Sequence, residues 1–359
     1  MSRTTRQVIF LTCHTVSMSV TDPNLDSLLQ DCHVVSIPLR TAFRGLNHRE
    51  VMILQGPQGP GEWAAFPEYS DKEAAAWLRS GIEQAFDYSV PFPSKQDQTV
   101  QVNAIFPQLE SQTIASWWEL FPRARSAKVK VGEGPNSEED IARIKTVRHI
   151  IGRGASIRLD ANGRWSVAQA AEILQYLQPI GVDYVEQPVA TIEEMVELKR
   201  RLRRTGIRVA ADELIRQSHQ LHQLIAQDAA DIAVLKVSPL GGIQPTLDLA
   251  RQAIHAGLDV VISSGLETSV GLSWGARAVA LLIEEFGPQP DAGLATATLF
   301  TSDITRDPLL VADGAIRASD PVLDDAALAR LSASPERTAW WHERLRRCLP
   351  LALEQFAGV

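Results

Sequence analysis

The feature that most restricts the fold of this chain is a regular alternation of short β-branched runs and longer amphipathic segments from about residue 100 onward. Segments such as 137–151 and 166–177 place apolar residues three and four positions apart, as an amphipathic helix requires. Strands alternating with helices form a parallel sheet, and eight of them predict closure into an α/β barrel of the (β/α)8 TIM type. The predicted strands are 100–106, 127–131, 156–162, 182–188, 207–213, 231–237, 258–264 and 290–296.

The first hundred residues follow a different pattern. Strands are predicted at 34–40, 50–56 and 61–66, with the turn-forming sequence GPQGPG between the last two, and a helix at 70–86. This indicates an α+β unit ahead of the barrel, and the tail predicts one more amphipathic helix at 338–356. We therefore expect a dispensable leader (1–25), an α+β domain (26–98), a barrel (99–310) and a C-terminal segment packed on either of them (311–359).

Composition excludes several classes of protein. A net charge of -8 and a pI near 5.6 argue against a nucleic-acid partner, which needs a basic surface. Three widely separated cysteines argue against a disulfide framework or a thiolate zinc site. No apolar run approaches the length of a membrane helix, and the apolar stretch after Arg6 is too short for a signal peptide. We expect a cytoplasmic protein without a membrane partner.

Charged residues recur at the carboxyl ends of five predicted strands. In a barrel these strand ends converge on one mouth, where active sites lie. Lys128 is two residues before Lys130 and therefore points to the same side of its strand. The spacing predicts that five groups separated by 24–30 residues meet in space: Lys130, Asp160, Glu186, Asp212 and Lys236.

Three carboxylates at one mouth repel each other unless a cation neutralises them. Hard oxygen ligands without cysteine suit Mg2+ best, with Mn2+ as the alternative. Metal charge and desolvation are expected to lower the pKa of a neighbouring lysine into the range of a general base. The set predicts proton abstraction next to a substrate carboxylate, with the metal stabilising the enolate-like intermediate.

Each residue alone has an ordinary structural explanation. Asp160 could cap the next helix, Glu186 could be a solvated loop residue, and Lys236 could extend from a strand edge to water. The pair Asp212 and Glu213 leaves open which carboxylate points inward. All five charged residues lie at the carboxyl ends of predicted strands, and this regularity favours the functional interpretation.

The motifs KVK, DAN, EQP, ADE and LKVSPLGG resemble those of the enolase superfamily, in its muconate-lactonising-type subgroup. More narrowly, the segment FRGLNHREVMILQGPQGPGEWAAFPEY, together with RLDANGRW and AWWHERLRRCL, is similar to the actinobacterial o-succinylbenzoate synthases. The resemblance extends from about residue 33 to about residue 350. It implies an α+β capping domain over a modified barrel and a lyase (hydro-lyase) of menaquinone biosynthesis, which dehydrates 2-succinyl-6-hydroxy-2,4-cyclohexadiene-1-carboxylate to 2-succinylbenzoate.

The resemblance also implies roles for individual residues. The Mg2+ ligands would be Asp160, Glu186 and Asp212. Lys130 would take the proton α to the carboxylate and protonate the departing hydroxyl in a syn elimination. Lys236 would stabilise the dienolate from the opposite face of the ring. Lys128 would lie near the metal-bound carboxylate and lower the pKa of Lys130.

Other implied roles concern the substrate. Arg158, two residues before Asp160, would contact it, with a structural ion pair as the alternative. Ser263, Ser264 and Gly265 would hold the succinyl group partly through backbone, with an ordinary strand-to-helix turn as the alternative. Arg44 lies in the segment that would close over the mouth. Glu267 is a departure from the family pattern that would bear on substrate contacts.

Two other functions are considered. One is an enzyme that uses the same residues, and the other is a non-catalytic protein that needs none of them. N-succinylamino acid racemase or dipeptide epimerase would use the same metal triad, with both lysines as bases on opposite faces. A non-catalytic barrel used for binding or assembly would not depend on Lys130. A small-molecule carboxylate is the partner expected for the synthase and for the racemase or epimerase. The sequence does not indicate the oligomeric state.

Overall fold

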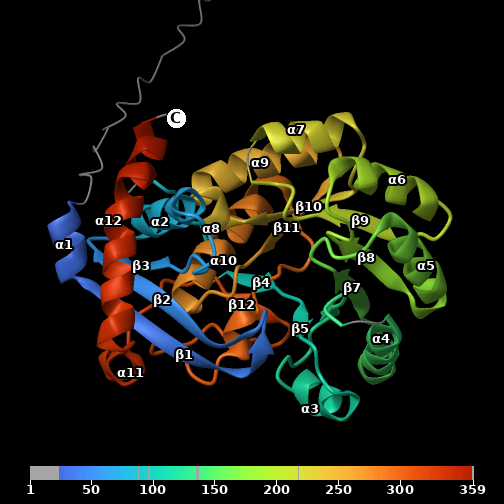
Figure 1. Cartoon of the computed structure of the whole chain (residues 1–359), viewed down its shortest axis with the longest axis horizontal. Coiled ribbons are helices and arrows are strands. Elements are labelled where there is room, and N and C mark those ends of the chain that lie inside the picture. Colours follow the sequence, from blue (N-terminus) through green and yellow to red (C-terminus); the bar gives the residue numbers. More distant parts are fainter. Residues whose placement is uncertain (1–23, 88, 96–97, 135–136, 217, 358–359) are drawn as a thin grey trace, which may run out of the picture.

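The computed structural model describes residues 24–87, 89–95, 98–134, 137–216 and 218–357. The predicted leader, 1–25, therefore lies almost entirely outside the described residues. Figure 1 shows two adjoining parts: a small antiparallel sheet with helices beside it, and a parallel sheet surrounded by helices. No helix within the described ranges is long and apolar enough to span a bilayer.

The small sheet is formed by the three strands β1 (Cys32–Phe43), β2 (Leu46–Gly56) and β3 (Gly59–Trp63), in that order. Helix α2 (Asp71–Phe86) packs against it and is capped at its N-terminus by Ser70, which forms a capping box with Glu73. A short helix, α1 (Leu25–Gln30), precedes the sheet. These elements confirm the three strands and the helix predicted for the first hundred residues.

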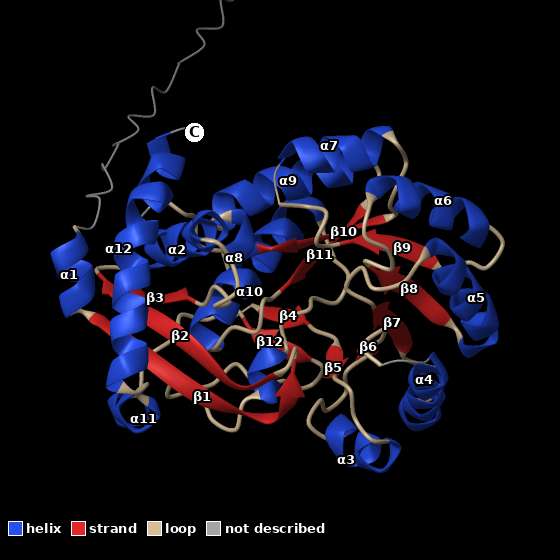
Figure 2. Cartoon of the chain, viewed as in Figure 1, coloured by secondary structure: helices blue, strands red, loops and turns tan. Residues whose placement is uncertain are grey.

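The larger sheet is parallel, with strand order β11-β10-β9-β8-β7-β6-β5. Its strands are β5 (Ala104–Phe106), β6 (Ser126–Lys130), β7 (Ser156–Asp160), β8 (Val182–Glu186), β9 (Arg208–Ala211), β10 (Ile232–Lys236) and β11 (Asp259–Ser263). Helices follow the strands and cover the outside of the sheet (Figure 2). They are α3 (Ile114–Trp118), α4 (Ser137–Ile151), α5 (Val167–Leu177), α6 (Ile192–Leu202), α7 (Ser218–Ala226), α8 (Val237–Leu240), α9 (Ile243–His255) and α10 (Ser269–Phe286). Short 3-10 turns are η1 (Ser111–Thr113), η2 (Gln178–Ile180) and η3 (Thr296–Leu299).

The barrel departs from the prediction at the first and last of the eight expected strands. The segment 100–106 is divided into β4 (Thr99–Gln101), which pairs with β12 (Ala315–Arg317), and β5. The segment 290–296 is not a strand. Instead, Ala292 N donates to Gln101 O and Gly293 N donates to Ile262 O, both at 2.8 Å, so two residues connect the edges of the sheet. Prolines at 288 and 290 and the scarcity of β-branched residues explain why no longer strand forms here.

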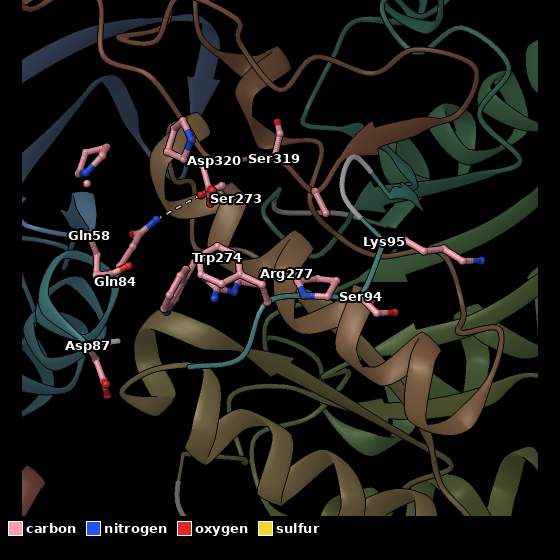
Figure 3. Close-up of a pocket in the computed structure, with 16 residues that line it drawn as sticks. Gln58, Gln84, Asp87, Ser94, Lys95, Ser273, Trp274, Arg277, Ser319 and Asp320 are labelled. Atoms are coloured by element: carbon pink, nitrogen blue, oxygen red, sulfur yellow. Dashed lines mark hydrogen bonds between the residues drawn. The ribbon is translucent and has the colours of Figure 1, made fainter. Parts of the chain in front are cut away.

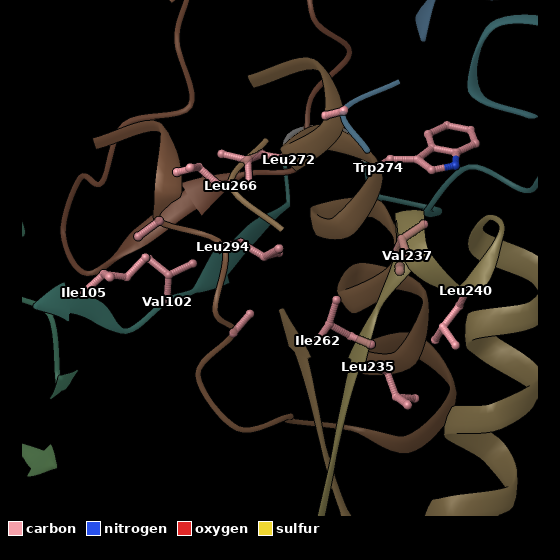
Figure 4. Close-up of a cluster of buried hydrophobic side chains, with 14 of the residues drawn as sticks. Val102, Ile105, Leu235, Val237, Leu240, Ile262, Leu266, Leu272, Trp274 and Leu294 are labelled. Atoms are coloured by element: carbon pink, nitrogen blue, oxygen red, sulfur yellow. The ribbon is translucent and has the colours of Figure 1, made fainter. Parts of the chain in front are cut away.

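The core has two parts. One large apolar cluster extends from the small sheet through the barrel to α10, and Figure 4 shows the part of it around Leu235, Ile262 and Trp274. A second, small cluster fills the barrel interior beneath the carboxyl ends of the strands. It consists of Tyr184, Ala210, Ile232, Val234 and Val261.

The C-terminal helix α12 (Pro335–Ala357), preceded by α11 (Asp325–Leu331), lies against the small sheet and α2 (Figure 1). The fully buried ring of Trp341 meets Trp63 of β3 edge-on, with ring centroids 5.1 Å apart. Arg344 donates to the backbone carbonyls of Ala65, Phe66 and Tyr69. The exact domain boundaries stay a prediction.

Candidate active site

Strand periodicity places the charged side chains directly above the small interior cluster. Tyr184 and Glu186 share one face of β8, as do Val234 and Lys236 of β10, because residues two apart on a strand point the same way. The apolar member of each pair packs inside the barrel. The charged member therefore lies one layer higher, at the mouth.

The register of neighbouring strands aligns the charges. Lys130 of β6 is level with Asp160 of β7, and Asp160 is level with Glu186 of β8. Asp212 directly follows β9, and Lys236 is the last residue of β10. The predicted convergence of these five residues is therefore seen in the structure.

Each lysine contacts a carboxylate from another strand. Lys130 Nζ is 2.9 Å from Asp160 Oδ2, and Lys128 Nζ is 3.1 Å from Glu186 Oε1 and 3.6 Å from Asp160 Oδ2. Lys236 pairs with Asp212. Lys128 and Lys130 share a carboxylate partner, so both point to the same side of β6.

Burial and ion pairing act in opposite directions on these groups. Burial lowers the pKa of Lys128, but the carboxylates of Glu186 and Asp160 outweigh it and hold that pKa above its ordinary value. Asp212 and Glu213 raise the pKa of Lys236 in the same way. Burial raises the pKa of Glu186 to about 7 despite its contact with Lys128. The lowered lysine pKa expected from the sequence requires a cation that competes for these carboxylates.

The carboxylates have the chemistry of a site for a hard divalent cation. Asp160, Glu186 and Asp212 are 3%, 1% and 0% exposed and come from three successive strands. Asp212 Oδ1 is buried without a hydrogen-bond partner, with Arg216 Nη1 3.7 Å away. Within the described ranges no group of three His, Cys, Asp or Glu side chains is positioned so that it could hold a metal ion. Each of these three carboxylates instead faces a lysine, although their chemistry is that of ligands for a dication.

A small cavity opens directly beside these groups, with room of about 50 Å³. Barrel residues form its floor and one wall, and residues of the small sheet form its roof. Phe43 reaches it from the end of β1, Arg44 from the turn after β1, and Phe66 from the segment after β3. Ser263, Ser264 and Gly265 are also in its lining, together with Lys128, Lys130, Asp160 and Lys236.

The predicted substrate-binding residues already have partners within the protein. Arg158 Nη1 donates to Asn103 Oδ1 (3.1 Å) and to Asp291 O (2.6 Å), and Arg158 is not part of the cavity lining. Ser264 Oγ donates to Gly293 O at 2.8 Å. Gly265 N donates to Glu267 Oε2 at 2.7 Å. Substrate contact by Arg158 and by 263–265 stays a prediction.

Family models and relatives agree with this arrangement. A model described as enolase N-terminal domain-like matches residues 34–85, and one described as enolase C-terminal domain-like matches 117–322. The o-succinylbenzoate synthase of Mycobacterium marinum is 41% identical over 91% of this chain and 96% of its own length. The chain belongs to the o-succinylbenzoate synthase family. The synthase of Mycobacterium tuberculosis is 40% identical over 93% of this chain and 98% of its own.

Solved structures with lower sequence identity share the fold. Muconate lactonizing enzyme from Pseudomonas putida has a TM-score of 0.67 at 22% identity, covering 84% of this chain and 98% of its own. N-succinyl Arg/Lys racemase from Bacillus cereus has a TM-score of 0.65 at 22% identity, covering 84% and 97%. These likenesses confirm the modified barrel with an N-terminal capping unit. Enzymes of this superfamily use a divalent metal.

Two residues at the mouth of this synthase-family barrel were not predicted as site residues. Asn162 follows Asp160 by two positions, contacts Lys130, and donates to Glu213 Oε1 at 2.7 Å. Burial and neighbouring Asp212 raise the pKa of Glu213. Asp212 and Glu213 therefore both face the mouth, which answers the question that the sequence left open. The signal for Asn162 was its place in the DAN motif, on the same face as Asp160.

A larger cavity, of about 570 Å³, lies between the capping unit and α10 (Figure 3). None of the predicted site residues is among its lining. Its buried cation, Arg277, donates to the carbonyls of Val90 and Pro91 and lies against the rings of Phe92 and Trp274. Arg277 holds backbone in place, and none of the lysine–carboxylate pairs found at the barrel mouth lies in this cavity.

Proposed function

We propose that this chain dehydrates 2-succinyl-6-hydroxy-2,4-cyclohexadiene-1-carboxylate to 2-succinylbenzoate, a step of menaquinone biosynthesis. The observation that carries the proposal is the set of three lysine–carboxylate pairs at one barrel mouth. It occurs in a chain about 40% identical to named synthases over more than 90% of its length. The enzyme is thus a hydro-lyase that acts on a small-molecule carboxylate.

Asp160, Glu186 and Asp212 would hold the divalent cation, which we assign as Mg2+, with Mn2+ as the alternative. Bound there, the cation would offset the negative charge that develops on the substrate carboxylate as its α-proton leaves. Carboxylate oxygens without sulfur or imidazole ligands support this assignment.

Lys130 takes the proton from the carbon α to the carboxylate, because it ends β6 at the mouth and lies beside Asn162 and Asp160. The electron pair of that C–H bond is first delocalised over the carboxylate and the ring diene. It then forms the new ring double bond as the C–O bond to the hydroxyl breaks. In a syn elimination the same ammonium then donates its proton to the departing hydroxyl, so that water leaves. Asn162 orients the Lys130 amine for both transfers.

Lys236 and Lys128 act by charge. Lys236 comes from β10, on the other side of the mouth from β6, and its ammonium stabilises negative charge spread over the ring. Lys128 lies between Glu186 and Asp160 and holds positive charge beside the substrate carboxylate. Phe43 and Phe66 cover the cavity from the capping unit and exclude water.

The alternative is racemisation or epimerisation of an N-succinylamino acid or a dipeptide. It is supported by the placement of Lys130 and Lys236 on opposite sides of the mouth, which suits two bases on opposite faces of one carbon.

One experiment compares the two functions. Purified protein with Mg2+ is incubated in D2O with the cyclohexadiene substrate and, separately, with N-succinyl amino acids and dipeptides, and products are followed by proton NMR. We expect 2-succinylbenzoate to form at least about tenfold faster, in kcat/KM, than deuterium enters the amino-acid substrates. Deuterium exchange without dehydration would contradict the proposed function and support the alternative.

A further inference from the structure

A buried arginine of the capping unit reaches into the barrel at the wall of the cavity. Arg49 of β2 is 1% exposed, and its Nε donates to Leu266 O at 3.1 Å. Its Nη2 also donates to the carbonyls of Ala64 and of Gly265, the latter at 3.5 Å. One guanidinium thereby binds carbonyls on both sides of the interface between the two units.

A buried carboxylate of the capping unit binds the next turn of the same barrel segment. Glu62 of β3 is 3% exposed and accepts from Thr268 N at 3.1 Å, Gly271 N at 2.9 Å and the Thr268 hydroxyl. These amides are at the start of α10, where N–H groups have no acceptor within the helix and Glu62 supplies one. Glycine is needed at 271, because a Cβ there would lie 2.7 Å from Glu267 Cβ and 3.2 Å from Glu62 Cδ.

Glu267 completes the network from within the barrel segment. It is 4% exposed, and its Oε2 accepts the Gly265 amide. The intervening Leu266 has φ of 66°, a left-handed conformation that costs free energy unless its surroundings hold it. Gly265 and Leu266 both form part of the cavity wall.

Buried charges contribute little net stability, since desolvation offsets their attraction, but their directional hydrogen bonds can specify a geometry. Here the barrel-side bonds of Arg49 and Glu62 fall within one short stretch, 265–271. That stretch begins in the cavity wall and ends in the first turn of α10.

We propose that Arg49, Glu62 and Glu267 are positioning residues: docking of the capping unit through them fixes segment 263–268 in the shape that receives the substrate. This inference rests on the proposed function, because it assumes that the substrate occupies the cavity beside Lys130. Glu267 acts on the backbone of Gly265, so its effect on substrate binding is indirect.

The test compares Arg49→Lys and Glu62→Gln with a matched control, Arg277→Lys. Arg277 is 7% exposed and also donates to two backbone carbonyls, but its acceptors, Val90 and Pro91, lie outside segment 263–268. For each protein we would measure kcat, KM, Tm and amide hydrogen exchange of peptides covering 263–271.

For Arg49→Lys and Glu62→Gln we expect KM to rise about tenfold or more and exchange over 263–271 to accelerate about tenfold or more. Arg277→Lys should lower Tm while leaving KM and that exchange at the wild-type values. A purely structural role would lower Tm in all three variants without a selective change in KM or in exchange, and would overturn the proposal. Amide hydrogen exchange is measured without turnover. A wild type that fails to dehydrate the substrate would therefore refute the proposed function, while exchange over 263–271 would still decide the positioning role.

Discussion

Lys128 and Lys130 are two residues apart on one short strand and share Asp160, yet each has a second partner of its own. Lys130 reaches Asp160 and Asn162, whereas Lys128 lies between Glu186 and Asp160. The alternation of a strand predicts that they share a face, and the spacing of the motifs predicts that three carboxylates lie at the same mouth. Partner choice depends on register between strands, which only the folded sheet defines.

Replacing Lys130 with alanine should lower kcat by about 10²–10⁴, because the proton acceptor is lost. Tm and metal affinity should change little, since Asp160 keeps Lys128 as a neighbour. Rates of 2-succinylbenzoate formation check this, with Lys199→Ala as a control that removes a lysine paired with Asp228 and Asp231 on the outside of the barrel. Undiminished turnover of the alanine variant at 130 would contradict the assignment and favour a non-catalytic barrel.

Glu62 should make stability fall as pH rises. Burial and neighbouring Glu267 raise the pKa of Glu62 to about 8 in the folded protein, from an ordinary value near 4.5. Between these values the unfolded chain loses its proton first, so folding is progressively disfavoured. The stability of Glu62→Gln relative to wild type should therefore increase from about pH 4.5 to about pH 8, as measured by urea unfolding.

The matched control for Glu62 is Glu83→Gln. Burial raises the pKa of Glu83 only to about 6, so its relative stability should level off near pH 6. A pH-independent difference between Glu62→Gln and wild type would show that Glu62 does not titrate in this range.

Some residues at the site could not be predicted from the sequence, and there is a physical reason in each case. Glu213 follows Asp212 just beyond the end of a strand, where alternation no longer determines direction. Glu62 binds Thr268 and Gly271, which lie 206 and 209 positions further along the chain, across the interface between the capping unit and the barrel. No local pattern encodes such a contact.

At the scale of elements, the hydrophobic period of the sequence predicted the helices and the inner strands of the barrel. The predictions that differ from the structure concern the first and last strands, where the barrel closes. Segment 290–296 was predicted as a strand from its place in the rhythm, but only Ala292 and Gly293 form bridges. Gly293 fits because a Cβ there would collide with Ser263 Oγ. The barrel is closed here by two bridging residues instead of a full strand. This depends on how all the strands are arranged around the barrel, so the hydrophobic period of one segment does not predict it.

The contact between β3 and α2 depends on glycine. A Cβ on Gly81 would lie 2.7 Å from the backbone oxygen of Glu62, so Gly81→Ala must separate the helix from the strand. We expect a loss of about 1–3 kcal/mol in the free energy of unfolding, which exceeds the gain from better helix propensity. Denaturant unfolding checks this against Gly154→Ala, where no atom lies within 4 Å of the added Cβ. Equal stabilities of the two variants would contradict the close approach.

At the scale of the whole molecule, the C-terminal helix ties the end of the chain to the capping unit. Trp341 is fully buried against Trp63 and donates to Glu50 Oε2 at 3.0 Å. Trp341→Ala should lower the free energy of unfolding by about 3–5 kcal/mol. Trp340→Ala, at the half-buried neighbouring position, should cost clearly less in the same assay. Equal losses would indicate that α12 is only loosely packed on the capping unit.

The fold brings three carboxylates and three lysines, at the ends of five successive strands of the barrel, to one mouth beneath the capping unit. The central claim is that this set catalyses a metal-dependent dehydration. Its most direct test is the rate of 2-succinylbenzoate formation by the purified chain, measured with Mg2+, after chelation with EDTA, and after Mg2+ is restored. We predict turnover with Mg2+, loss of at least about 100-fold on chelation, and recovery on restoration. Folded protein that forms no product with Mg2+, or forms it equally fast after chelation, would contradict the account.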